Sequence, residues 1–63
     1  MIGIVMGIDK DAAPALGDVR ALGVGDRILL NLGVEKRKDW PRYVDAIGVA
    51  ITRGADVGWV RNG

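Results

Sequence analysis

The stretch from residue 43 to residue 61 constrains the fold of this chain most, because it holds two apolar runs either side of a short polar break. In the first run bulky side chains alternate with alanine and glycine, and the bulky positions are Ile47, Val49 and Ile51. A two-residue period is typical of a β-strand with one bulky face and one nearly bare face. Residues 57–61 continue the alternation after a break of hairpin length, so the pattern predicts a β-hairpin.

The same residues also admit a helix at 39–53. Asp39 would cap its start, Pro41 would lie in its first turn and Gly54 would end it. The interior of such a helix is unfavourable, because it is rich in β-branched residues and Gly48 costs about 1 kcal/mol relative to alanine. We therefore favour the two strands, and this choice decides the fold class.

The earlier part of the chain predicts two more strands and little helix. Residues 1–8 are apolar, with bulky side chains on one face of the predicted strand and glycines on the other. Residues 27–34 form a second long apolar run. Between them, residues 12–22 have room only for a short helix, since a proline and a glycine interrupt it. With the hairpin, these elements predict a mainly β fold with one short helix. The alternative is an α+β fold with a helix at 39–53.

Length and composition bound the class of protein. The 63 residues, 1–63, make a single small domain, of a size that buries only about 60% of its unfolded surface and is marginally stable alone. The chain has neither cysteine nor histidine, which excludes disulfides, thiolate chemistry, zinc fingers and histidine-activated nucleophiles. Because 49% of its residues are apolar, we expect a partner, either a second copy or another protein, to cover one face.

Charge and hydropathy limit the surroundings in which the chain works. Its formal net charge of +1 creates no strong field toward nucleic acid. There is no uncharged stretch near the roughly 20 residues that span a bilayer, and no basic leader at the N-terminus. We expect a soluble cytoplasmic protein without membrane contact.

One charge cluster, residues 35–39, lies beside two aromatic residues and a further arginine. This composition suits a loop that binds a single nucleic-acid strand, because cations meet phosphates while rings stack on bases. The candidate binding residues are Lys36, Lys38, Trp40, Arg42 and Tyr43, with Lys10 and Arg61 as flanking phosphate contacts. The alternative is a solvated loop whose Trp40 packs on the core, since Glu35 and Asp39 nearly balance the neighbouring cations.

Catalytic and cofactor motifs do not emerge from the sequence. The nearest carboxylate pairs, Asp9 with Asp11 and Asp39 with Asp45, lack an environment that would split their pKa values or hold a metal. The spacing of Gly3 and Gly7 does not match a phosphate-binding loop. We therefore expect neither enzymatic activity nor a cofactor.

Four short motifs follow one another in the order found in the HIRAN domain, which this chain resembles. They are an apolar first strand ending in Gly7, the pair Gly25-Asp26, the run Asp45-Ala-Ile-Gly-Val49 and the run Gly54-x-x-Val-Gly-Trp-Val60. The resemblance implies a small open β-barrel of the OB or SH3-like kind that binds single-stranded DNA and its 3′ end. Residues 40–43 keep only the proline of the family's Asn-Pro-Tyr-Asp loop, so general strand binding is expected rather than specific end recognition.

Two hypotheses of function therefore stand side by side. The first is a HIRAN-like module that binds single-stranded nucleic acid, in particular DNA, through the loop of residues 36–43. The second is a structural or interaction subunit of a phage or multiprotein assembly, completed by self-association or by a partner. A molecular mass measured with and without an oligonucleotide distinguishes them.

Overall fold

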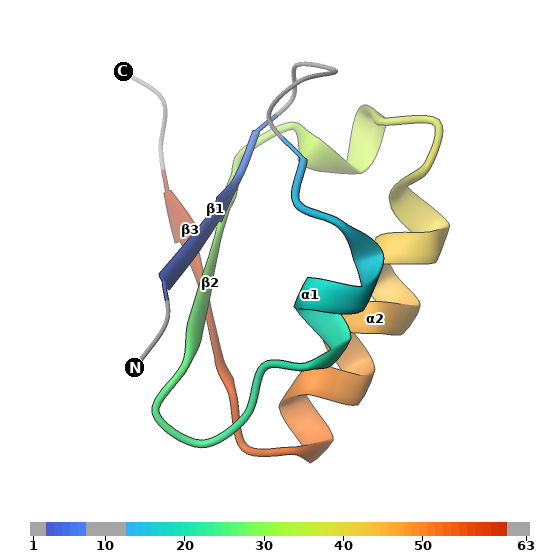
Figure 1. Cartoon of the computed structure of the whole chain (residues 1–63). Coiled ribbons are helices and arrows are strands. Elements are labelled where there is room, and N and C mark those ends of the chain that lie inside the picture. The colour runs from blue at the N-terminus through green and yellow to red at the C-terminus, as the bar shows by residue number, and fades with distance from the viewer. Residues whose placement is uncertain (1–2, 8–12, 61–63) are drawn as a thin grey trace.

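The structure is a computed structural model, and it describes residues 3–7 and 13–60. Three strands alternate with helices along the chain (Figure 1). In order the elements are β1 (Gly3–Met6), α1 (Leu16–Arg20), β2 (Arg27–Asn31), the 3-10 helix η1 (Val34–Lys36), α2 (Trp40–Thr52) and β3 (Asp56–Val60).

The three strands form one open parallel sheet in the order β1-β2-β3. Val5, Leu29 and Gly58 lie in one row across it. Each strand is joined to the next through a helix, and α1 and α2 both lie on the same face of the sheet (Figure 1). The molecule thus has two layers, with helices on one face of the sheet.

The core lies between these two layers. Its strand residues point toward the helices, and the helix residues point back at the sheet. The buried hydrophobic residues are Met6, Val19, Leu22, Ile28, Leu30, Val34, Tyr43, Ala46, Ile47, Ala50 and Ala55. Two of the buried residues of α2, Ala46 and Ala50, are small.

The mainly β fold and the barrel that the HIRAN resemblance implies are wrong for this chain. Residues 43–51 lie in α2, not in a strand, and β3 pairs with β2 in parallel, not in a hairpin. The physical reason is tertiary packing. Tyr43, Ile47 and Ala50 form a buried stripe with helical spacing, and their burial outweighs the poor helix propensity of the β-branched residues.

Two of the three end signals of α2, Pro41 and Gly54, were correct, and they belong to the alternative with a helix at 39–53; Asp39 lies at the N-cap but makes no side-chain cap hydrogen bond. Pro41 lies in the first turn, where its missing N–H is not needed. Gly54 ends the helix in the left-handed conformation with φ +98°. Its N–H donates to Ile51 O at 2.9 Å and the Ala55 N–H donates to Ala50 O at 3.0 Å, the pair of bonds that defines a Schellman motif.

The other predicted elements are present where the structure describes the chain. β1 lies within the predicted strand 1–8, α1 within the predicted helix 12–22, and β2 within the predicted strand 27–34. No helix in the described residues has both the length and the apolar character needed to cross a membrane.

Candidate functional site

The predicted binding loop lies where the parallel strands end. It follows β2, includes η1 and leads into α2, so it sits at the carboxyl edge of the sheet (Figure 1). In open α/β sheets this edge is where ligands generally bind. The position suits a binding site, and the side chains then decide what the site can do.

Arg37 fixes the shape of this loop and was not among the predicted binding residues. Its Nε donates to Asp39 Oδ1 at 2.9 Å and its Nη2 donates to Asp39 Oδ2 at 3.1 Å. Its Nη1 donates to the carbonyl oxygen of Gly7 at 3.2 Å, at the end of β1. The side chain is only 8% exposed. Arg37 therefore ties the loop to the neighbouring strand and offers little to a phosphate.

The Arg37–Asp39 pair also changes the electrostatics at the start of α2. The hydrogen bond from Arg37 and its positive charge hold the pKa of Asp39 below the usual range. Because its carboxylate faces Arg37, Asp39 makes no side-chain cap on α2. The backbone N–H groups of Arg42 and Tyr43 donate to Asp39 O, and Pro41 has none. The helix start therefore presents no set of unused donors to an anion.

The two aromatic residues of the loop differ in what they can contact. Tyr43 is buried, and its hydroxyl donates to the carbonyl oxygen of Pro14 at 2.6 Å. Its ring is thus a core element, with the Arg37 Cζ 6.0 Å from the ring centroid. Trp40 is half-buried and packs against the core. Only part of the Trp40 ring is available to stack on a base.

Three predicted cations remain at the surface of this end of the molecule. Lys36, Lys38 and Arg42 are exposed. Two further predicted contacts, Lys10 and Arg61, lie outside the described residues. The structure therefore leaves the two lysines, Arg42 and part of Trp40 accessible, while it assigns Tyr43 to the core.

The second candidate surface is the face of the sheet opposite the helices, which we call the open face. Side chains alternate along each strand, so residues between the buried ones point to it. It consists of Gly3, Val5, Arg27, Leu29, Asn31, Asp56, Gly58 and Val60. Val5 on the edge strand β1 is 59% exposed, and Leu29 on the middle strand is half-buried. Arg27 and Asp56 are register neighbours at one end of the strands, and the Arg27 guanidinium reaches toward Gly58. Nothing in the described part of the chain covers this face.

The glycines shape the open face. A Cβ on Gly3 would meet nothing within 4 Å, whereas a Cβ on Gly58 would lie 3.0 Å from Leu29 Cδ2. The Leu29 side chain therefore lies over Gly58, whereas the space above Gly3, next to Val5 on the same strand face, is left empty by the described residues. The Arg27 guanidinium also lies near Gly58, with Nη2 3.6 Å from a Cβ at that position, so the apolar part of the open face is at Val5 and Leu29.

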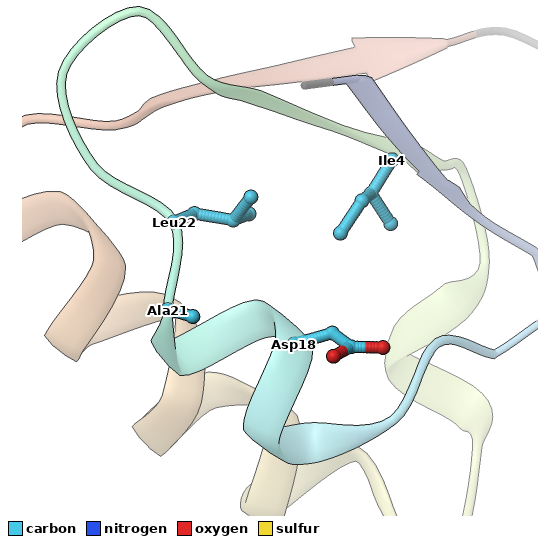
Figure 2. Close-up of a pocket in the computed structure, with 4 residues that line it drawn as sticks. All are labelled: Ile4, Asp18, Ala21 and Leu22. Carbon is cyan, nitrogen blue, oxygen red and sulfur yellow. The ribbon is translucent and has the colours of Figure 1, made fainter. Parts of the chain in front are cut away.

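A pocket of about 360 Å³ lies between β1 and α1 (Figure 2). It is lined by Ile4, Asp18, Ala21 and Leu22. A single carboxylate among aliphatic side chains provides neither an acid–base pair nor a metal cage. The described residues contain no group of three or more metal-binding side chains.

Comparison of the chain with protein-family models, curated proteins and solved structures finds no match. The run from Asp45 to Val49, which carries much of the HIRAN resemblance, lies inside α2. The geometry of the two surfaces is therefore what bears on function.

Proposed function

We propose that the chain is a non-enzymatic interaction subunit that binds another protein through the open face of its sheet. One observation carries this proposal: an all-parallel sheet has helices on one face only, and on the other face Val5 of the edge strand β1 is 59% exposed. Parallel sheets occur almost entirely with both faces covered. An apolar face left bare in an isolated domain of this kind marks an interaction site.

The partner that fits this face is an amphipathic helix. Helices are the elements that cover parallel sheets, and they pack along the strands with bulky side chains against small ones. The open space at Gly3, where a Cβ would meet nothing within 4 Å, accepts such a side chain. Arg27 and Asp56 at one end of the face are positioned to pair with charges at the rim of the helix.

Site-specific photo-crosslinking in the source cells tests this proposal. A benzoylphenylalanine at position 5 should form a defined adduct with one protein, and the same group at position 24 serves as the control. Val24 is a suitable control because it is exposed in a loop away from the open face. The adduct at position 5 should disappear when Leu29 is replaced by lysine. Equal adducts at positions 5 and 24, unaffected by Leu29→Lys, would contradict docking on this face.

A second candidate function is the binding of single-stranded nucleic acid at the carboxyl edge of the sheet. The observation in its favour is the exposed group of Lys36, Lys38 and Arg42 beside the half-buried Trp40. The contribution of Arg37 is reduced because it binds Asp39 and Gly7. We therefore rank this function second.

Fluorescence anisotropy with a labelled single-stranded oligonucleotide at low salt tests the second function. Trp40→Ala should weaken binding by about tenfold or more, since stacking contributes about 1–3 kcal/mol per base. Lys36→Ala and Lys38→Ala should each weaken binding less and reduce the salt dependence by about one phosphate contact. A circular dichroism spectrum controls for folding of Trp40→Ala, because Trp40 packs against the core. Absence of binding by the unaltered chain at low salt would exclude this function.

A further inference from the structure

The outer edge of β3 is a second unpaired surface, distinct from the open face. β3 is the last strand of the sheet, and among the described residues nothing pairs with its outer side. The Asp56 N–H donates to Asp26 O at 3.0 Å, and the Leu32 N–H donates to Val60 O at 3.1 Å. In a parallel ladder alternate residues bond to the same neighbour. Val57 and Trp59 therefore direct their backbone N–H and C=O groups outward.

Among the described residues this edge carries one charge, Asp56 at the start of β3, and no lysine or proline. Natural edge strands are guarded by lysine, proline, a bulge or a covering segment. Here the outward-bonding residues are Val57 and Trp59, separated by Gly58. Trp59 lies in the same row as the buried Leu30, yet it is 56% exposed. An apolar strand edge of this kind favours addition of another strand.

The flank of α2 that continues this edge is also apolar. Val44 and Ile51 are exposed, and Gly48 lies between them on the same side of the helix. The opposite flank faces α1 and the loop after it, where Arg53 O would lie 3.3 Å from a Cβ on Gly23. The flank with Val44 and Ile51 is thus turned away from α1, toward β3, and it carries no charge.

We propose that a second copy of this chain pairs with the β3 edge in antiparallel orientation, with a two-fold axis through Gly58. In this register Val57 lies opposite Trp59 of the second copy, and the reverse pair follows from symmetry. Both residues direct their backbone groups outward, so each pair exchanges two hydrogen bonds, and a β-branched side chain meets an aromatic ring.

The β3 edge and the apolar flank of α2 are both chemically suited to contact a second copy. The axis is perpendicular to the sheet, so both α2 helices lie on the same side and run antiparallel. Val44 of one copy then approaches Ile51 of the other, with Gly48 at the crossing, where a Cβ would meet nothing within 4 Å. In this register Asp56 of one copy lies opposite the uncharged Val60 of the other copy, so like charges do not meet. Such an isologous interface is closed and forms a six-stranded sheet with its open face still uncovered.

A single introduced cysteine tests the register. The chain has no cysteine of its own, so Gly58→Cys places one thiol on the two-fold axis. Opposed residues at a non-hydrogen-bonded antiparallel pair have Cα atoms about 4.5 Å apart, which a disulfide can bridge. The new Cβ lies 3.0 Å from Leu29 Cδ2 and 3.6 Å from Arg27 Nη2, and both are ends of flexible side chains that can move. We expect nearly complete covalent dimer on mild oxidation. Val5→Cys is the control, because Val5 lies on β1 and is about as exposed as Trp59. This variant should stay monomeric on a denaturing gel.

The mass in solution provides a second test that does not depend on the cysteine variant. The unaltered chain should sediment at twice its 6.7 kDa mass. Trp59→Lys should lose the dimer while it keeps its circular dichroism spectrum, and Val5→Lys should remain a dimer. A 6.7 kDa species for the unaltered chain overturns the proposal. A dimer that survives Trp59→Lys also overturns the proposal. A dimer that Val5→Lys abolishes overturns it as well, because the contact would then lie on the open face. The β3 dimer and the docking of a partner helix can therefore fail separately.

Discussion

Ile28 and Leu29 are consecutive residues of β2, yet they lie on opposite faces of the sheet and in different environments. Ile28 is fully buried beneath the helices, whereas Leu29 is half-buried on the open face beside the exposed Val5. Both faces have apolar side chains in their middle rows. Both faces of the sheet therefore present apolar side chains that a layer of helices could cover. The chain's own helices cover only one of these faces. The difference separates residues that stabilise the fold from residues that remain available to a partner.

The largest expected effect lies on the covered face. Ile28→Ala should lower the free energy of unfolding by about 2–5 kcal/mol, because it removes methyl groups from a packed core. Val5→Ala on the open face should change it by no more than about 0.5 kcal/mol. Urea titrations followed by circular dichroism measure both values. Equal losses at the two positions would show that the open face is covered in the isolated chain.

An intermediate effect is expected at Tyr43, which joins α2 to the segment before α1. Tyr43→Phe removes the hydroxyl and leaves the carbonyl oxygen of Pro14 without this donor. The free energy of unfolding should fall by about 1–2 kcal/mol. Thermal unfolding of the two chains measures the change. A loss below about 0.3 kcal/mol would contradict a structural role for this hydrogen bond.

The smallest expected effect lies at the salt bridge between Arg37 and Asp39 in the loop, and it depends on pH. Arg37 lowers the pKa of Asp39 in the folded state. The pair therefore stabilises the fold above the unfolded pKa of aspartate, about 3.9, and this contribution is lost as the pH falls through the lowered value. Asp39→Asn should reduce stability at neutral pH and make its loss in acid less steep.

The partner residue provides the control for this prediction. Arg37→Ala should remove the same part of the pH dependence, and the double variant should show no further change in it. Arg37→Ala alone should destabilise more at neutral pH, because it also removes the bond to Gly7. The loss of stability at low pH can be compared among the unaltered chain, the two single variants and the double variant. An identical loss in all four would contradict the lowered pKa of Asp39.

The sequence contained the individual elements but not their arrangement. The start of β2 at Arg27 and the stop of α2 at Gly54 follow from local chemistry, whereas the predicted strand 27–34 ran past the end of β2 at Asn31. The alternation of residues 46–51 was misleading, because Ala46 and Ala50 are buried through their helical spacing of four, not as one face of a strand. The continuous apolar run in β2 was a genuine signal of a parallel sheet, since such strands are apolar on both sides. Parallel pairing in turn requires a crossover helix, which α2 provides.

The candidate sites were predictable to different degrees for a related reason. The surface lysines of the loop could be found from residue types alone. The roles of Arg37 and Tyr43 could not, because they depend on Gly7 and Pro14, whose backbone carbonyls lie far away in the sequence. The open face also depends on tertiary structure, since a strand pattern does not show which of its two faces the helices will cover.

Solvent exposure of the methyl groups on the two faces tests the central claim most directly. A soluble paramagnetic probe can be added to the methyl-labelled chain while its NMR spectrum is recorded. The methyl signals of Val5 and Leu29 should broaden strongly, while those of Ile28 and Leu30 should stay sharp. Equal protection of both pairs would mean that the sheet is covered on both faces, and the proposed docking surface would not exist.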